Sequence, residues 1–332
     1  MIEVMIIRIA AILMLVNVLV AQESGCNKNK RTNMSTTAQE YVAAFKRGED
    51  FVSPAKGVFS GGQPDEAALQ VLGRELATAE PAVRENIVHL LVDMGRLCDP
   101  LTKQGADVLR HPRILELLAT GGLAKPDLGR EAAMDALRKL ATPRDLQRFD
   151  TAFTNALAEE PTSEAFLLVA KAKSQKAKDL IERLIKLPKW ENMEAARIAR
   201  AALGSTEDED KFLEKAAAST DSGTALAEAI GPLALMGTER SLKFIAEQLR
   251  SPLTIEIPGH GPGKSVKSVR LNVLDGLLYN FPQEPVLYPN NINRDEDYRA
   301  AERFCSANFG TVYKDPPPPY LKFGNVPEPI RG

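Results

Sequence analysis

A spacing of 32 residues repeats through the middle of the chain. Thr142, Ser174, Thr206 and Thr238 mark it. Apolar residues keep fixed distances from these markers. Eight residues before them stand Met134, Phe166, Ile198 and Ile230, and five before stand Leu137, Val169, Ala201 and Leu233. Seven residues after them stand Phe149, Ile181, Leu213 and Ile245, and eleven after stand Phe153, Ile185, Ala217 and Leu249. Because residues three and four apart share one face of an α-helix, each unit is expected to be a helix, a tight turn and a second helix. One such unit cannot bury its apolar face alone, whereas stacked units can.

The period therefore predicts an all-α fold, an α-solenoid of antiparallel helix pairs with irregular ends. The alternative is a helical bundle whose helices have similar lengths. Helices are expected near 36–48, 65–78, 82–97, 113–119, 128–141, 143–158, 163–173, 175–187, 190–203, 207–218, 222–236, 238–250, 265–281 and 295–308. Pro64, Pro81 and Pro143 stand at helix starts, where a proline nitrogen loses no hydrogen bond. Thr142, Thr206 and Thr238 are expected to cap helix starts. Residues 253–257 are the one strand candidate.

Two stretches resemble the Val-Arg helix of HEAT-like repeats. They begin at Val83-Arg84 and at Val269-Arg270, and each continues with apolar residues at helical spacing. Residues 130–146 are similar to one such helix, its turn and the next helix start. The resemblance covers most of 64–281 and is closest to the short bacterial HEAT-like type. It implies a fold, and it implies almost nothing about activity.

The N-terminus is typical of an export signal. Residues 9–21 form an apolar run of 13 residues that contains one polar side chain, Asn17, and the run is too short to span a bilayer. Cys26 resembles a lipoprotein junction, although Glu23 departs from that pattern. We therefore expect an exported protein, periplasmic or secreted, with Cys26 as the candidate for lipidation and for a tether to an envelope membrane.

These features divide the chain into four segments. We expect a signal peptide over 1–21, a polar tether over 22–35, a HEAT-like helical repeat domain over 36–310, and a Pro-rich tail over 311–332. The regular 32-residue units lie at about 128–250 in this scheme. The tail contains four consecutive prolines and should be extended. It either packs on the last helices or docks on another protein.

The three cysteines give no predicted disulfide. In a linear array, Cys98 and Cys305 would lie several helix pairs apart, beyond the reach of about 7 Å between bridged Cα atoms. We expect both to be buried, inert thiols.

Charge patterning gives a second set of predictions. The net charge of −2 provides no basic face for nucleic acid. Stacking of 32-residue units places Lys176 beside Asp208, and Lys178 beside Asp210. These four residues predict an inter-repeat charge ladder, and the alternative is a bipolar patch that contacts a partner.

The Gly/Pro-rich stretch 258–265 ends in Lys264 and Ser265, before the helix expected at 265–281. Its spacing does not fit a phosphate-binding loop, so nucleotide binding is disfavoured. Weak anion binding by Lys264 and Ser265 at that helix start is the alternative to a plain connector. The three histidines, His89, His111 and His260, show no metal-ligand spacing.

The sequence thus favours an exported, non-catalytic scaffold that holds a protein or peptide on a concave helical surface. No catalytic residue, cofactor, metal or small-molecule ligand is predicted. The first alternative is a lyase-like or hydrolytic enzyme on the same scaffold, which a pocket joining His89, His111 and carboxylates would favour. The second is a structural component of an envelope assembly.

Overall fold

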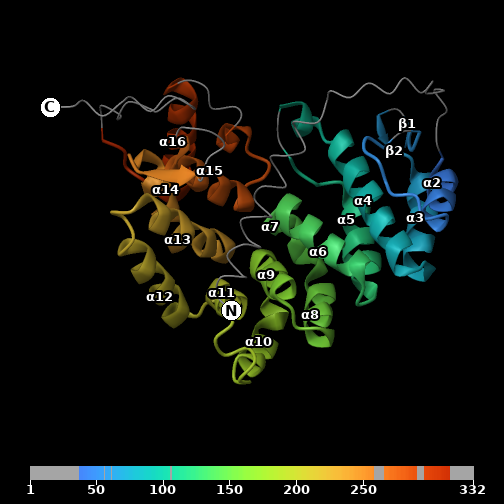
Figure 1. The fold of residues 1–332 in the computed structure, drawn as a ribbon, viewed down its shortest axis with the longest axis horizontal. Coiled ribbons are helices and arrows are strands. Elements are labelled where there is room, and N and C mark those ends of the chain that lie inside the picture. Colours follow the sequence, from blue (N-terminus) through green and yellow to red (C-terminus); the bar gives the residue numbers. More distant parts are fainter. Residues whose placement is uncertain are drawn as a thin grey trace. The chain divides into compact units, whose positions relative to one another are not determined.

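The computed structural model describes residues 37–314, except 56, 61, 105–106, 258–264 and 290–294. These residues belong to one compact unit of the chain and are mostly helical, as the sequence predicts (Figure 1). The α-helices are α2 (Ala38–Lys46), α3 (Glu66–Thr78), α4 (Pro81–Cys98), α5 (Pro112–Glu116), α6 (Leu128–Leu140), α7 (Pro143–Leu146), α8 (Asp150–Glu159), α9 (Ser163–Ala172), α10 (Lys178–Leu184), α11 (Glu194–Ala202), α12 (Thr206–Ala217), α13 (Gly223–Met236), α14 (Glu239–Glu247), α15 (Val269–Asn280) and α16 (Asp295–Phe309).

Short 3₁₀ or π segments extend or connect these helices. They are η1 (Pro100–Gln104), η2 (Leu117–Gly121), η3 (Gly122–Ala124), η4 (Gln147–Phe149), η5 (Gln175–Ala177), η6 (Gln248–Arg250) and η7 (Pro285–Leu287). The helix predicted over 113–119 is therefore α5 followed by the π turn η2, and the helix predicted over 143–158 is divided into α7, η4 and α8.

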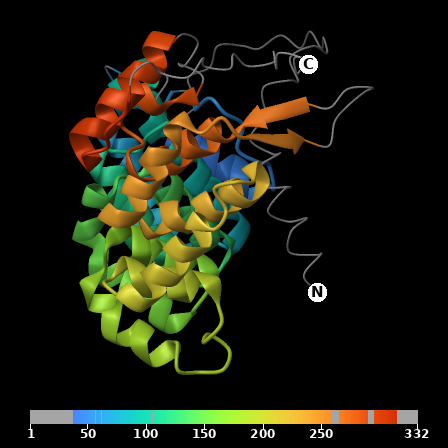
Figure 2. The same ribbon diagram turned by 90° about the vertical axis from the view of Figure 1, so that its left-hand side faces the viewer.

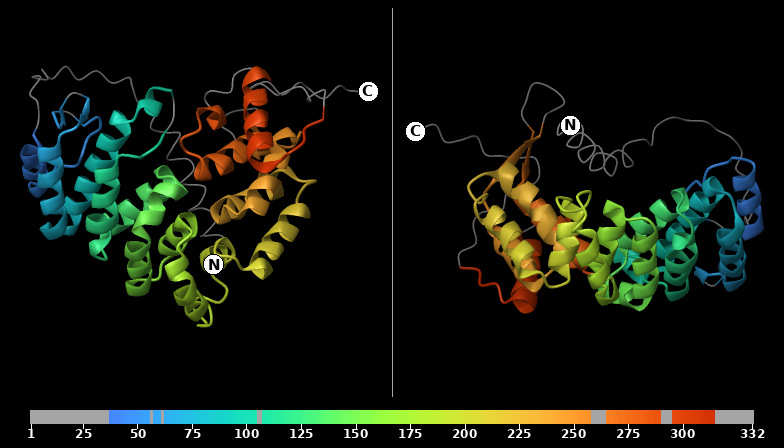
Figure 3. Two further views of the ribbon diagram at one scale, coloured as in Figure 1. Left: turned by 180° about the vertical axis from the view of Figure 1, so that it is seen from behind. Right: turned by 90° about the horizontal axis from the view of Figure 1, so that it is seen from below.

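Helices that alternate along the chain pack against one another. α4 contacts α6, α6 contacts α9, α9 contacts α11, α11 contacts α13, and α13 contacts α15. We call these six helices the central row. α3, α8, α10, α12 and α14 each pack against the central-row helix that follows them in the chain, and η2 and η3 pack against α6. Figure 3 shows the helices following one another in chain order.

The apolar positions of the 32-residue period mostly lie in the core. All eight positions before the markers are buried, from Met134 to Leu233, and all lie in the central row. Five of the eight positions after the markers are also buried. Phe149 and Leu213 are partly buried and Ala217 is exposed, so the burial predicted from the period is wrong at Ala217.

Helix α11 separates two apolar clusters. Ala196 and Ala199 belong to a cluster that extends back to α2. Ile198 and Ala201 belong to a second cluster that extends forward to α16. Small side chains let α11 lie close to α9, and α9 also contacts α13 directly. The two clusters are therefore joined through opposite faces of one helix.

A buried arginine joins three segments near the start of the central row. Arg84 of α4 has 0% exposure, and its Nε donates to the Asp127 carboxylate at 2.7 Å. Nη2 donates to the carbonyl oxygens of Gly121 and Gly122 at 3.2 and 3.0 Å, and Nη1 donates to the carbonyl of Leu76. Because the last carbonyls of a helix lack partners within the helix, the guanidinium satisfies the ends of α3 and η2 together.

Several helix starts have the predicted chemistry. The hydroxyls of Thr142 and Thr238 accept amide hydrogen bonds at the starts of α7 and α14, which confirms these caps. Pro81 and Pro143 are the first residues of α4 and α7, as predicted. The prediction for Pro64 is wrong, because this residue lies in β2 and Asp65 caps α3. The cap expected at Thr206 is wrong by one residue, because Ser205 accepts from the amide of Asp208 instead.

Two short hairpins interrupt the helices. β1 (Phe59–Ser60) pairs with β2 (Gln63–Pro64), and β3 (Thr254–Ile257) pairs antiparallel with β4 (Ser265–Ser268) (Figure 2). The strand predicted at 253–257 is confirmed. The helix predicted over 265–281 is wrong at its start, because residues 265–268 pair with β3 and Ser268 caps α15.

Three of the predicted segments lie partly or wholly outside the described residues. The signal peptide, the polar tether and Cys26 fall within residues 1–36, and the tail is described only as far as Lys314. Within the part of the chain that the structure describes, no helix has both the length and the apolar character needed to cross a membrane.

Candidate binding surfaces

One face of the central row is only partly covered by other segments. On α6, α9 and α13 this face carries Glu131, Asp135, Glu164, Leu167, Glu228 and Gly231, all of them exposed or half-exposed. We call these six residues the exposed stripe. They lie three or four residues apart within each helix, and Glu164 and Glu228 are separated by two 32-residue periods. The corresponding residues of α11, Ala196 and Ala199, are buried, so α11 does not contribute.

The exposed stripe is acidic. Glu131, Glu164 and Glu228 form no ion pair with any other described residue, whereas Asp135 pairs with Arg138 at 3.1 Å and Lys139 at 2.9 Å. Glutamates near a helix start are favoured by the helix dipole, so their presence alone does not require a ligand. The stripe nevertheless offers three carboxylates that have no ion pair with a described residue, together with one partly buried leucine, Leu167.

Two lysines lie at the C-terminal end of α9. Lys171 is 1% exposed and donates to the carbonyl of Arg138 in α6. Lys173 has a left-handed backbone conformation and donates to the carbonyl of Met236 in α13. Burial lowers the pKa of Lys171 well below its usual value and lowers that of Lys173 to about 8. Both ammonium groups therefore donate hydrogen bonds to carbonyls at the C-terminal ends of neighbouring helices, Lys171 to α6 and Lys173 to α13.

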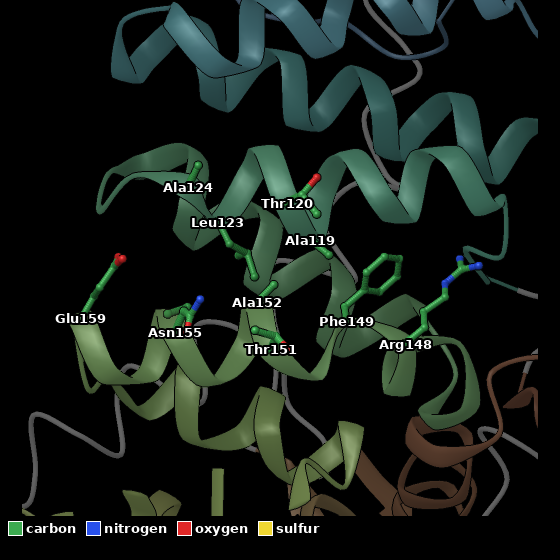
Figure 4. A pocket seen from close by; sticks show the side chains of 11 residues that line it. Ala119, Thr120, Leu123, Ala124, Arg148, Phe149, Thr151, Ala152, Asn155 and Glu159 are labelled. Atoms are coloured by element: carbon green, nitrogen blue, oxygen red, sulfur yellow. The ribbon is translucent and has the colours of Figure 1, made fainter. Parts of the chain in front are cut away.

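A groove lies between η2–η3 and α8 (Figure 4). It has a volume of about 430 Å³, and its floor includes the buried side chains of Ala119, Leu123 and Ala156. Arg148 stands at one end and Glu159 at the other. Both charges are already engaged: Arg148 lies 4.7 Å from the Phe149 ring centre, and Glu159 accepts from the buried Arg130 at 2.6 Å.

The predicted charge ladder has other partners. Asp208 is buried and pairs with Arg197 at 3.1 Å and with Arg200, both in the preceding helix α11. Asp210 pairs with Arg240 of α14 at 2.8 Å. These arginines reach the carboxylates with long side chains, so the predicted pairs with Lys176 and Lys178 do not occur.

The two lysines of the ladder turn away from those carboxylates. Lys176 donates to the hydroxyl of Thr151 in α8 at 2.7 Å, which is a contact toward the preceding unit rather than the following one. Lys178 is exposed at the start of α10 and has no ion pair with a described residue. Polar contacts therefore join neighbouring units, but they are not the pairs that the 32-residue register predicted.

The anion site predicted at a helix start is not formed there. Ser265 lies in β4, four residues before α15 begins, and Lys264 lies outside the described residues. The prediction fails because the Gly/Pro-rich stretch connects two strands of a hairpin rather than a loop and a helix.

The histidines occupy separate positions. His89 is exposed on α4, with Nε2 3.9 Å from the Glu85 carboxylate. His111 caps α5, where Nδ1 accepts from the amide of Ile114 at 3.4 Å, and burial lowers its pKa. His260 lies outside the described residues. Among the described residues, no set of three or more His, Cys, Asp or Glu side chains is arranged to hold a metal ion.

The two cysteines of the helical domain are free thiols. Cys305 is fully buried, as predicted, and burial raises its pKa to about 11. Cys98 is only partly buried at the end of α4, where its thiol donates to the Gly95 carbonyl at 3.2 Å. Burial, reinforced by Asp99, raises the pKa of Cys98, so neither thiol is activated as a nucleophile.

Sequence reasoning did not identify the buried cations. Arg84, Arg130 and Arg270 are buried in the first turn of α4, α6 and α15, and the sequence pattern included them only as part of the resemblance to HEAT-like repeats. A charged residue at an otherwise apolar position was the available signal, because a buried arginine requires carbonyl or carboxylate partners.

Comparison of the chain with protein-family models, with curated protein sequences and with solved structures gave no match.

Proposed function

We propose that this protein is an exported, non-catalytic α-solenoid of HEAT-like helix pairs that holds a protein or peptide partner on the exposed stripe. The observation that carries the proposal is the recurrence of unpaired carboxylates on one face of the central row, at Glu131, Glu164 and Glu228. A surface that repeats along successive units suits an extended partner, because each unit adds a modest contact.

The order of contacts supports the solenoid arrangement. Each central-row helix packs against the next, and each is covered by the helix before it in the chain, or, for α6, by η2 and η3. The concave surface expected of such an array would contain the exposed stripe. Its charge favours a partner segment rich in lysine or arginine, since complementary charges increase the association rate and select among partners.

The enzyme alternative receives less support from the geometry. His89 lies on α4 and His111 caps α5, and neither lines the groove between η2–η3 and α8. The structural alternative, in which the Pro-rich tail docks in an envelope assembly, depends on residues that lie mostly beyond Lys314. We retain export, with lipid at Cys26 as the means of a membrane tether, as part of the proposal.

A charge reversal tests this function. The full chain carrying Glu131→Lys, Glu164→Lys and Glu228→Lys is compared with the wild type for co-purification of partners from envelope extract. The control carries Glu191→Lys, Glu214→Lys and Asp221→Lys, three exposed carboxylates on other surfaces with the same total charge change.

Loss of a partner from the stripe variant alone, with unchanged far-ultraviolet circular dichroism, is the expected result. Equal retention of every partner by the stripe variant and the wild type would overturn the proposed surface.

A further inference from the structure

We propose that a groove beside α16 binds an acidic peptide segment of a partner protein. The groove has a volume of about 710 Å³. One wall is α16, with Arg299 and Arg303, and the other is the segment after α16, with Thr311, Val312 and Tyr313. It shares no residue with the exposed stripe, so it is a second surface beyond the proposed function.

The groove has an excess of positive charge. Arg250 from η6 is held by both oxygens of Glu302 at 2.6 and 3.0 Å, so these two charges offset each other. Arg299 and Arg303 are exposed and have no ion pair with a described residue. They lie one helical turn apart on the same face, where like charges repel and destabilise a helix. Carboxylates of a ligand would relieve this repulsion.

Thr311 provides an unused hydrogen-bonding group in the same groove. The residue is 4% exposed, and its Oγ1 has no hydrogen-bond partner. Its backbone carbonyl accepts from the Ser306 hydroxyl at 2.8 Å, which fixes the segment against α16. A buried hydroxyl without a partner destabilises the folded chain, because it has lost its hydrogen bonds to water. A peptide carbonyl or carboxylate oxygen entering the groove could accept its hydrogen.

The wall opposite α16 favours a peptide over an isolated anion. Val312 is 87% exposed, an apolar side chain directly beside the cations. The Tyr313 hydroxyl donates to the Ala246 carbonyl at 2.7 Å, and its ring lies 5.0 Å from the Arg250 guanidinium carbon. This wall is therefore anchored before a ligand arrives. A small anion would use the arginines only, whereas a peptide with alternating acidic and apolar residues would also cover Val312.

A nucleic acid is a poorer fit. Its backbone requires a succession of cations, and its affinity depends on many released counterions. The groove offers two uncommitted arginines, and the chain has a net charge of −2. The observations therefore favour a short acidic segment.

Fluorescence anisotropy of the full chain with labelled eight-residue peptides tests the proposal. The probes are an alternating Asp/Leu peptide, a Lys/Leu peptide of equal length, and unlabelled inorganic phosphate as a competitor. We expect the Asp/Leu peptide to bind, the Lys/Leu peptide not to bind, and phosphate at millimolar concentration not to compete. The variant Arg299→Gln/Arg303→Gln should weaken binding at least about tenfold.

Two further variants keep the test specific. Arg144→Gln/Arg183→Gln removes two exposed arginines elsewhere and should leave the affinity unchanged. Thr311→Val keeps the shape of the side chain and should weaken binding severalfold. Three results would overturn the proposal. Equal loss of affinity in both double-arginine variants would show a general effect of positive charge, and full competition by phosphate would show a simple anion site. Binding that appears only after residues 315–332 are deleted would show that the groove is a site for this chain's own segment.

Discussion

The ammonium of Lys171 lies 4.3 Å from the centre of the Tyr279 ring. The lysine belongs to α9 and the tyrosine to α15, two central-row helices that are not consecutive. Lys171 also donates to the carbonyl of Arg138 in α6, so one buried side chain links three helices. The cation has an aromatic face and a carbonyl oxygen as partners but no carboxylate, which explains why burial lowers its pKa.

The lowered pKa of Lys173, the second lysine of this helix end, predicts how stability changes with pH. Its folded-state pKa is about 8, against about 10.4 in an unfolded chain. Between these values the unfolded state binds more protons, so this residue makes the folded state more stable as pH rises from 8 to 10.

We expect the free energy of unfolding, measured with urea at several pH values, to rise more for the wild type than for Lys173→Met over this range. Comparison with a variant is needed because Tyr279 and Tyr288 have raised pKa values and act in the opposite direction above pH 10. Lys178→Met, at an exposed position, should retain the wild-type dependence.

Arg84→Met should destabilise the protein strongly. The substitution keeps the apolar stem but removes the guanidinium that donates to Asp127 and to the carbonyls of Leu76, Gly121 and Gly122. Removing one member of a buried ion pair costs about 3–5 kcal/mol. Urea unfolding measures the loss.

Arg47→Met removes the exposed pair with Glu49 and should cost less than about 1 kcal/mol. A similar small loss for both arginine variants would contradict the role assigned to Arg84.

Two glycines of α13 should respond differently to alanine. A Cβ on Gly223 would overlap with the Thr254 carbonyl of β3, whereas a Cβ on Gly231 would meet nothing within 4 Å outside its own helix. Gly223→Ala should therefore lower the melting temperature by separating the β3–β4 hairpin from the helix. Gly231→Ala should change the melting temperature much less, because the better helix propensity of alanine is opposed by contact of its Cβ with the ring of Pro232. A stabilised Gly223→Ala variant would mean that the hairpin is not held against α13.

Asp208 and Asp210 provide a matched comparison of buried and exposed ion pairs. Although burial opposes it, hydrogen bonds from Arg200 and Arg197 lower the pKa of Asp208. Asp208→Asn should cost about 2–3 kcal/mol at pH 7. Because the folded-state pKa is the lower one, the wild type loses this advantage as pH falls below about 4, and the difference should shrink there.

Asp210→Asn affects a half-exposed pair with Arg240 and should cost less than about 1 kcal/mol. Thermal unfolding of both variants at pH 7 and pH 3.5 checks the contrast. Equal losses at the two positions would show that the buried arginine contacts of Asp208 stabilise the protein no more than the exposed pair of Asp210.

The sequence alone determined the local structure. Apolar residues at spacings of three and four, together with Thr142, Thr238 and Pro143, define helices and their starts, because helix formation depends on neighbours within a few residues. The 32-residue period also identified which positions of α6, α9, α11 and α13 are buried. The short strand β3 was visible as an extended apolar segment.

Only the tertiary structure decided which side chains meet. Residues 265–268 became a strand because β3 supplied hydrogen-bonding partners, although the sequence there was also compatible with a helix. Asp208 turned to the arginines of α11 rather than to Lys176. Likewise, the partners of Arg84 and Lys171 lie on segments distant in sequence. The sequence specifies the charge and length of each side chain. Its partners depend on how the helices pack, and that packing involves contacts that no local pattern specifies.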